Sequence, residues 1–167
     1  MATQPTGALP EYRLHPIGFV RLGEGSYCLE ILPPYRAALK EMRQFSHLLI
    51  FWWADQVDNP EQRAILTTEL PYAPGVAAGV FACRAPYRPN PIALTTLPWL
   101  EVDEENGLVV LPWIDAEDGT PLLDLKPYIP LSDRIREVRQ AGWMAGWPEW
   151  MEDAGKFFAR NEVDLGG

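Results

Sequence analysis

The sequence predicts a mainly β protein, a small antiparallel or mixed β-barrel of six to seven strands with inserted and C-terminal helices. Short apolar segments follow one another along the chain and are separated by hairpin signals, such as the Glu-Asn-Gly turn at residues 105–107. The regular alternation of strands and helices that is typical of a doubly wound parallel sheet is missing. The chain has 167 residues, of which 47% are apolar, so it can form one domain with a buried core. These observations favour a closed or nearly closed barrel.

The strands are expected where short apolar or alternating segments end at turn residues. In chain order they span residues 15–22, 26–32, 46–55, 77–84, 92–102, 108–116 and 120–131. The segment 46–55 is apolar throughout, which predicts a central strand that is covered on both faces. The segment 120–131 contains three prolines, which cannot donate to a sheet, so it is expected at an edge.

Three helices are expected. Residues 33–45 have an apolar face and a proline in the first turn, and residues 147–161 are amphipathic. Residues 59–70 are expected to form one short helix, with Asn59 as its cap and Pro60 at its first position. The expected domain organisation has three parts, namely a flexible lead at 1–13, a barrel domain at 14–142, and a C-terminal amphipathic helix with a tail at 143–167.

The net charge of −9 argues against a non-specific nucleic-acid binder, which would normally be basic. The positive residues nevertheless gather in two places, at Arg84 with Arg88 and between residues 126 and 139. A local field matters more than the sum of charges at a binding site. The sequence therefore leaves room for an anionic ligand beside either group.

Several classes of protein are disfavoured by the composition. The longest apolar run, 47–54, is too short to span a bilayer. Cys28 and Cys83 have no spacing typical of a zinc site, which indicates a reduced, cytoplasmic protein. With only two histidines, His15 and His47, a metal site is not expected.

The segment "GVFACRAPYRPNPIAL" (79–94) combines rigidity with positive charge. Its three prolines restrict the residues before them to extended geometry, so the loop loses little entropy on binding a ligand. Arg84 and Arg88 are planar donors that suit a carboxylate or a phosphate, and Asn90 can both donate and accept. The alternative, about equally supported, is a rigid corner whose arginines pair with nearby acids.

A second cluster lies within "EDGTPLLDLKPY" (117–128). Asp118-Gly119-Thr120-Pro121 is a turn signature. Asp124, Lys126 and Tyr128 follow it closely and could serve binding or proton transfer. A charged strand edge explains these residues almost as well.

Both segments resemble the signature of a known family. "GVFACRAPYRPNPIAL" and "DGTPLLDLKPYIP" (118–130) are similar to the two signature segments of the TsaA/TrmO-like (YaeB-like) family. The strands "HPIGFVR" (15–21) and "FSHLLIFWW" (45–53) resemble further segments of that family. The resemblance implies a β-barrel methyltransferase that uses S-adenosylmethionine and works as a homodimer. Its implied reaction is N6-methylation of threonylcarbamoyladenosine at position 37 of tRNA.

The resemblance also implies roles for individual residues. The cofactor contacts carried over by motif are Asp55, Gln56, Arg84, Leu94, Asp118, Gly119, Thr120 and Pro121. Arg84 is expected to bind the cofactor carboxylate, and Arg88 with Asn90 to bind the substrate. The catalytic candidates are Tyr128, Asp124 and Lys126, of which the first two could act as a base.

The sequence departs from the family pattern at several positions. Cys83, Ala85 and Ala93 stand where Thr, Ser and Gly are common, and Asp55 replaces a His. The family's Pro-Arg-Gln cofactor-contacting segment is not visible in residues 23–34, and the extra C-terminal domain of longer members is not expected. Two alternatives therefore stay open: a methyltransferase of the same barrel with another substrate, and a non-catalytic protein that binds the cofactor.

Overall fold

The computed structural model describes residues 10–23 and 25–161, which divide into two compact units. The first unit runs up to Trp53 and includes Leu94–Tyr128; the second consists of Ala54–Ala93 and the residues from Ile129 on. Each unit is described by itself. The lead predicted at residues 1–13 falls largely outside the described residues, and the boundary predicted at residue 142 stays a prediction.

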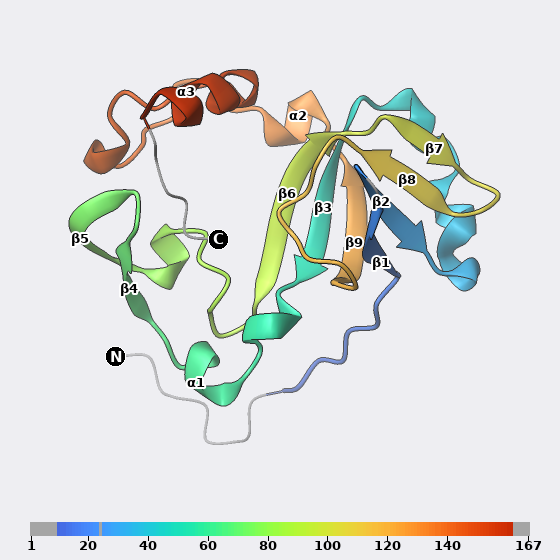
Figure 1. The fold of residues 1–167 in the computed structure, drawn as a ribbon, viewed down its shortest axis with the longest axis horizontal. Helices are drawn as coiled ribbons and strands as arrows, with labels where there is room; N and C mark the ends of the chain where they lie inside the picture. Colours follow the sequence, from blue (N-terminus) through green and yellow to red (C-terminus); the bar gives the residue numbers. More distant parts are fainter. Residues whose placement is uncertain (1–9, 24, 162–167) are drawn as a thin grey trace. The chain divides into compact units, whose positions relative to one another are not determined.

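A seven-stranded sheet dominates the first unit, in the order β6-β3-β9-β1-β2-β8-β7 (Figure 1). Its strands are β1 (Gly18–Gly23), β2 (Ser26–Ile31), β3 (His47–Trp53), β6 (Ile92–Pro98), β7 (Glu101–Asp103), β8 (Leu108–Leu111) and β9 (Pro121–Pro127). The pairs β1–β2, β1–β9, β2–β8, β3–β9 and β7–β8 are antiparallel. The predicted mainly β class is confirmed. No pairing between β6 and β7 joins the edges among the described strands, so closure of the barrel stays a prediction.

The hairpin predicted at residues 105–107 is confirmed between β7 and β8. Gly107 adopts a φ of 75°, which a glycine tolerates without a steric penalty. Its N–H donates to the carbonyl of Asp103 at 2.8 Å. The Asp103 carboxylate accepts the Asn106 side-chain amide at 2.7 Å and its backbone N–H at 3.0 Å, and these bonds lower the pKa of Asp103. The turn residues thus set the register of the hairpin.

The core lies against one face of this sheet. Val20, Leu29, Ile50, Val109 and Leu122 are fully buried on five different strands. Leu39 and Met42 reach the same core from outside the sheet. Burial of these aliphatic side chains provides the main driving force for folding of the first unit.

Two expectations about the sheet are wrong. The segment 120–131 is not an edge strand, because β9 lies between β3 and β1 (Figure 1). Its prolines are tolerated because Pro121 and Pro127 stand at the two ends of the strand, where few ladder hydrogen bonds are lost. The strand at 46–55 is interior, as predicted, but only Leu48 and Ile50 are fully buried, so one face alone meets the core.

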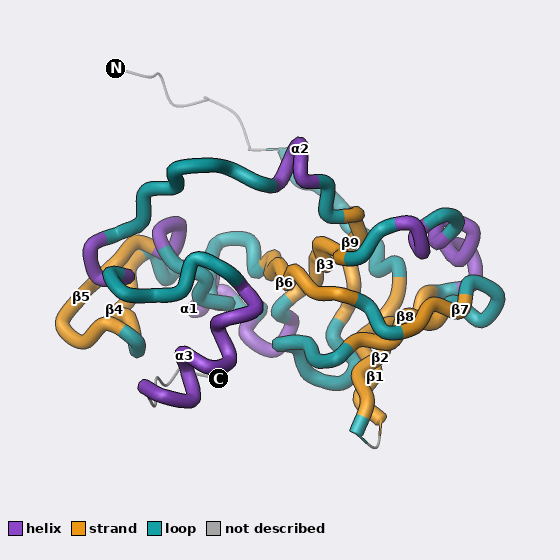
Figure 2. Tube along the Cα trace, turned by 90° about the horizontal axis from the view of Figure 1, so that it is seen from above, coloured by secondary structure: helices purple, strands orange, loops and turns teal. Residues whose placement is uncertain are grey.

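The predicted helices are mostly shorter or of another type. Figure 2 shows that the helical segments are short. Residues 33–45 form two 3-10 helices, η1 (Pro33–Leu39) and η2 (Met42–Gln44), instead of one α-helix. Only Leu39 and Met42 of the expected apolar face are buried. A longer α-helix would need more of its apolar face packed against the core to be stable.

In the second unit, the helix expected at 59–70 is only α1 (Pro60–Arg63), and its predicted cap is confirmed by the hydrogen bond from Gln62 N–H to Asn59 Oδ1 at 2.9 Å. Residues 67–70 are instead strand β4 (Thr67–Leu70), which pairs with β5 (Ala73–Gly79). The β-branched threonines favour the extended form. The strand expected at 77–84 ends at Gly79, where the 3-10 helix η4 (Val80–Ala82) begins.

The C-terminal part of the second unit contains α2 (Pro130–Asp133), η5 (Gly142–Met144), η6 (Met151–Asp153) and α3 (Ala154–Asn161). The helix expected at 147–161 is therefore confined to α3, and the residues just before it form the 3-10 helix η6. The Tyr72 ring lies 5.6 Å from that of Trp143 and 5.4 Å from that of Trp147, between ring centroids. These contacts attach the C-terminal segment to the turn between β4 and β5.

Among the described residues, none of the helices has both the length and the apolar character needed to cross a membrane. The described part of the chain likewise contains no group of three or more His, Cys, Asp or Glu side chains that could hold a metal ion. Cys28 and Cys83 are free thiols, and burial raises the pKa of Cys28.

Candidate functional site

The turn at Asp118–Pro121 belongs to the first unit and is anchored on β1. The N–H of Gly119 donates to the carbonyl of Val20 at 2.9 Å, and the N–H of Val20 donates to the carbonyl of Thr120 at 2.9 Å. Gly119 has a φ of 83°, which makes the tight turn possible. Thr120 is only 3% exposed, whereas Asp118 is exposed. The turn is thus rigid and presents its carboxylate outward.

The Asp118 carboxylate already has one structural partner. Its Oδ1 accepts the N–H of Leu22 at 2.9 Å, across 96 residues of sequence. An ionised carboxylate has about four acceptor positions, so the side chain can still accept hydrogen bonds from a ligand. The bond to Leu22 fixes the side chain in one orientation, which favours precise binding.

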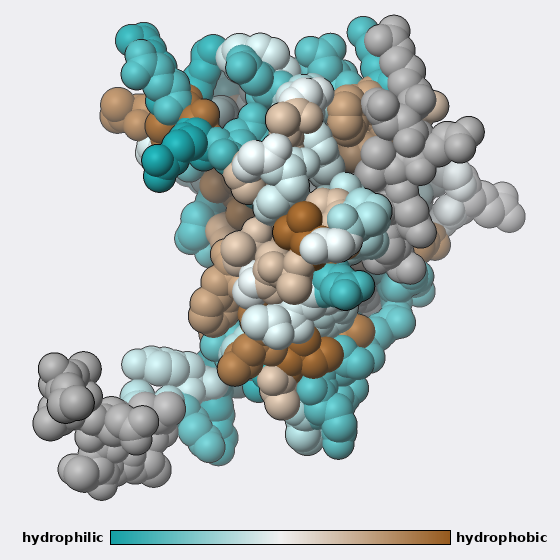
Figure 3. Space-filling view, turned by 90° about the vertical axis from the view of Figure 1, so that its left-hand side faces the viewer, coloured by the Kyte–Doolittle hydropathy of each residue, from teal (hydrophilic) through white to brown (hydrophobic). Residues whose placement is uncertain are grey.

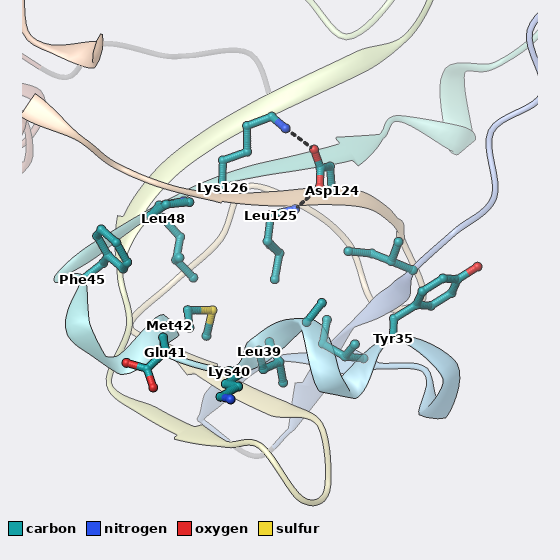
Figure 4. Close-up of a pocket in the computed structure, with 14 residues that line it drawn as sticks. Tyr35, Leu39, Lys40, Glu41, Met42, Phe45, Leu48, Asp124, Leu125 and Lys126 are labelled. Atoms are coloured by element: carbon teal, nitrogen blue, oxygen red, sulfur yellow. Dashed lines mark hydrogen bonds and ion pairs between the residues drawn. The ribbon is translucent and has the colours of Figure 1, made fainter. Parts of the chain in front are cut away.

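Asp124 and Lys126 form an ion pair on β9. Lys126 Nζ lies 2.6 Å from Asp124 Oδ2, and Asp124 Oδ1 accepts the N–H of Leu125 at 2.9 Å. The Lys126 side chain is 57% exposed and the Asp124 side chain 49%. Both lie on the opposite side of β9 from the Leu125 side chain (Figure 4). Such a pair fits the charged strand edge that the sequence left open, and a catalytic role for either residue stays a prediction.

Tyr128 follows β9 directly. Its N–H donates to the carbonyl of His47 at 2.9 Å, and its ring meets the His47 ring edge-on, with 6.4 Å between centroids. The Tyr128 hydroxyl makes no hydrogen bond to any residue that the structure describes. Of the three catalytic candidates, Tyr128 is therefore the one whose side-chain polar atom is not engaged with another described residue.

The proline-rich loop of the second unit is held from within by Arg88. Its Nε donates to the carbonyl of Ala85 at 3.0 Å, and its Nη2 donates to the carbonyls of Cys83, at 2.8 Å, and Val80. Three of the five guanidinium donors are thus used on backbone oxygens. Arg88 stabilises the loop through carbonyls, not through the acidic partners that the rigid-corner alternative had assumed.

Arg84 has the opposite environment. It is exposed, and it makes no hydrogen bond or ion pair with another described residue. Its guanidinium therefore stands on a rigid loop with all of its donors available to an anion. The two arginines lie four residues apart in one loop but differ in environment. Arg88 bonds the loop backbone, whereas the Arg84 guanidinium is available to a ligand.

Other contacts attach this loop to the rest of the second unit. The Tyr87 hydroxyl and Thr68 Oγ1 are 2.8 Å apart, which links the loop to β4. The N–H of Ala54 donates to the carbonyl of Pro91 at 2.9 Å. This bond brings Asp55 and Gln56, at the start of the 3-10 helix η3 (Asp55–Val57), close to the end of the loop.

The predicted site residues are divided between the two units. Asp55, Gln56, Arg84, Arg88 and Asn90 belong to the second unit, where Asp55, Gln56 and Asn90 are exposed. The first unit holds the remainder: Leu94, which is 37% exposed, Asp118, Gly119, Thr120, Pro121, Asp124, Lys126 and Tyr128. The structure thus places each subset within one unit, and one composite site made of both stays a prediction.

The sequence missed the residues that support the loop. Thr68 is one of them, through its contact with the Tyr87 hydroxyl. Arg63 is another, because it pairs with Asp58 and its Nη1 lies 3.5 Å from the carbonyl oxygen of Pro89. The hydrogen bond with Asp58 raises the pKa of Arg63. Arg63 lies 26 residues from Pro89, and no local pattern signals a contact at that distance.

Comparison with known proteins identifies the family. The sequence model of one protein family, the tRNA-methyltransferase O N-terminal domain, matches residues 16–134, which is more than half of the chain. A protein of Pyrococcus abyssi named "probable S-adenosyl-L-methionine-binding protein" is 34% identical over 136 residues, which cover 80% of this chain and 70% of that protein. A protein of Pyrococcus horikoshii with the same description is 34% identical and is matched over 92% of its length and 78% of this chain.

Two further comparisons agree with this. A Pseudomonas aeruginosa protein named "putative S-adenosylmethionine-dependent methyltransferase RcsF" is 38% identical over 75% of this chain and 56% of its own length. A crystal structure of TrmO from the same species superposes with a TM-score of 0.63 and 27% identity, over 95% of this chain and 77% of that one. The chain therefore belongs to the family of the tRNA-methyltransferase O N-terminal domain.

Proposed function

We propose that the protein is an S-adenosylmethionine-dependent methyltransferase that methylates N6 of threonylcarbamoyladenosine at position 37 of tRNA. The membership of the family supports a methyltransferase, and the observation that carries the cofactor assignment is the unpaired, exposed Arg84 on its rigid loop. A guanidinium binds a carboxylate with two parallel hydrogen bonds, and the cofactor ends in such a group. Asp118, fixed by its bond to Leu22, suits the ribose hydroxyls or the amino group of the cofactor.

When bound, the cofactor would supply a methyl group on a sulfonium, an electrophile for in-line displacement by a nucleophilic nitrogen, with the thioether as leaving group. The contribution of the protein is mainly to hold the reacting atoms near each other in a productive orientation. The N6 nitrogen of the substrate is amide-like, so removal of its proton assists the attack. Tyr128 is the preferred base, because Asp124 is engaged with Lys126 at 2.6 Å.

We revise the proposed role of Arg88. It was expected to bind the substrate carboxylate, but its three hydrogen bonds to carbonyls make it a positioning residue that holds Arg84 and Asn90 in place. Asn90 remains a candidate contact to the substrate, since it is exposed and its side chain has no described partner.

Arg84→Ala tests the cofactor assignment. Calorimetry with S-adenosylmethionine should show an affinity lower by about tenfold or more, as expected when a charge-assisted bidentate contact is lost. Arg136→Ala is the matched control, because Arg136 is also exposed and has no described partner. Equal affinities of the two variants would refute the role of Arg84.

The substrate is tested by transfer of a labelled methyl group to bulk tRNA and by mass spectrometry of tRNA nucleosides from a deletion strain. Loss of the methylated threonylcarbamoyladenosine in that strain would establish the reaction. A second candidate, a non-catalytic binding protein, is favoured by Asp55, which replaces the histidine of the family pattern. Cofactor binding without methyl transfer to tRNA or to other nucleotides would support this candidate.

We also propose that the protein acts as a homodimer. Large apolar side chains are exposed on the second unit, with exposures of 95% for Leu131, 85% for Phe81 and 74% for Ile135. Figure 3 shows one face of the molecule on which hydrophobic patches lie among hydrophilic ones. Light scattering after gel filtration measures the mass, and a monomer at micromolar concentration would contradict the proposal.

A further inference from the structure

The first unit contains a pocket of about 240 Å³ between its two 3-10 helices and the sheet (Figure 4). The helices η1 and η2 form one wall, and β3 and β9 form the other. The residues around it are Ile17, Ile31, Tyr35, Ala38, Leu39, Lys40, Glu41, Met42, Phe45, Leu48, Asp124, Leu125, Lys126 and Pro127. None of them belongs to the predicted cofactor set.

The interior of this pocket is apolar. Leu39, Met42 and Leu48 are 3%, 9% and 1% exposed and point into it (Figure 4). Leu125 also points inward but is only half-buried. The ion pair of Asp124 and Lys126 lies on the other side of β9, so only the backbone of these two residues borders the space.

The charged side chains stand at the boundary of the pocket. Lys40 and Glu41 are exposed and lie at the break between η1 and η2. Glu41 has a φ of 66° and a ψ of 0°, which directs the chain away from a continuous helix. Because the chain breaks here instead of continuing as one helix, Lys40 and Glu41 form a polar edge on an otherwise apolar pocket.

We propose that this pocket is a binding site for a small apolar molecule, aromatic or short aliphatic, whose polar end lies near Lys40 and Glu41. An engineered apolar cavity of about 150 Å³ in another protein binds benzene, so the volume here is sufficient for a somewhat larger ring system. The site is distinct from the proposed cofactor site. Its volume is below the roughly 300–1,000 Å³ of sites for drug-sized ligands, and its interior offers no partner to a charged amino-acid end.

Indole is the probe, since it combines an apolar bicyclic ring with one polar N–H. The chain has four methionines, and Met42 is the one that lines the pocket, whereas Met144 and Met151 belong to the second unit. With methyl-labelled methionine, indole should shift the Met42 resonance and give contacts from its ring protons to that methyl group. Met144 and Met151 should not respond. Absence of a saturable Met42 response at millimolar indole would overturn the proposal, as would equal responses of the three methionines.

A pair of variants tests the location independently. Ala38→Phe inserts a ring at the pocket, whereas Ala37→Phe makes the same change at the neighbouring exposed position that does not line it. The first variant should weaken indole binding by about tenfold or more, as expected for loss of most of the buried apolar contact, and the second should leave it unchanged. Equal effects would overturn the proposal. Saturating S-adenosylmethionine should leave the affinity for indole unchanged, and competition would show that the pocket is part of the cofactor site.

Discussion

Arg88→Ala provides the sharpest test of how the proline-rich loop is held. In the structure, one guanidinium bonds the carbonyls of Val80, Cys83 and Ala85, which lie on both sides of the exposed Arg84. The substitution removes all three bonds at once and leaves the Val80 carbonyl with only the Cys83 thiol, whose Sγ lies 3.8 Å away. We expect a lower free energy of unfolding and a loop whose backbone conformation is less restricted.

The magnitude follows from the type of bond. A hydrogen bond that involves a charged group contributes about 1.5–3 kcal/mol. Arg88 is only partly buried, so water can replace some of what is lost, and we expect a total loss of about 2–4 kcal/mol. Urea unfolding followed by circular dichroism measures this difference. Arg84→Ala is the control, because an exposed residue without partners should change stability by at most about 0.5 kcal/mol.

A positioning role and a substrate-binding role give different results. If Arg88 positions the loop, Arg88→Ala lowers stability and also weakens cofactor binding, and Arg88→Lys restores little, because an ammonium cannot reproduce the planar fork. If Arg88 binds a substrate carboxylate, stability and cofactor affinity stay unchanged while the KM for tRNA rises. A variant within about 0.5 kcal/mol of the parent protein would refute the reasoning from the three carbonyls.

Three further predictions concern smaller effects. Lys126→Ala should lower the free energy of unfolding by at most about 1 kcal/mol, because its ion pair with Asp124 is half exposed, and urea titrations at low and high salt should show a smaller difference at high salt. Asn59→Ala should cost about 1 kcal/mol in the same titration through loss of the cap on α1, and no change would contradict the hydrogen bond to Gln62. Burial, and then the charges of nearby Cys83 and Tyr87, raise the pKa of Tyr72 above its usual 10.0. The shift therefore stabilises the folded state fully below pH 10.0, and this stabilisation is lost as the pH rises through the pKa of Tyr72 in the folded protein. Melting temperatures measured across the alkaline range should therefore fall less steeply for Tyr72→Phe.

The fold class could be predicted from the sequence because it depends on local patterns. Short apolar segments and the Gly107 turn are read within a few residues, and both are confirmed. The position of β9 could not be read in this way, since it depends on pairing with β1 and β3, which lie far away along the chain. Its prolines indicated an edge only because the sequence does not show that they stand at the two ends of the strand.

The residues of the candidate site could be selected from the sequence, but their environments could not. Arg84 and Arg88 have the same chemistry and lie four residues apart in one loop, so the pattern assigned each of them to an anion. The difference arises because the chain between Val80 and Ala85 turns its carbonyls toward Arg88. A sequence shows which side chains can donate, whereas the direction of backbone carbonyls is set by the folded loop.

Under the proposed function, the two guanidinium groups of the proline-rich loop have different tasks. A single exposed arginine on a mobile loop loses conformational entropy when it binds, which lowers its affinity. Here the prolines restrict the backbone and Arg88 bonds it to itself, so most of that entropy is already lost in the folded protein. Arg84 can then bind a carboxylate at little additional cost. A loop made rigid by Arg88 is therefore compatible with the proposed binding of an anion by Arg84, because the rigidity lowers the entropic cost of that binding.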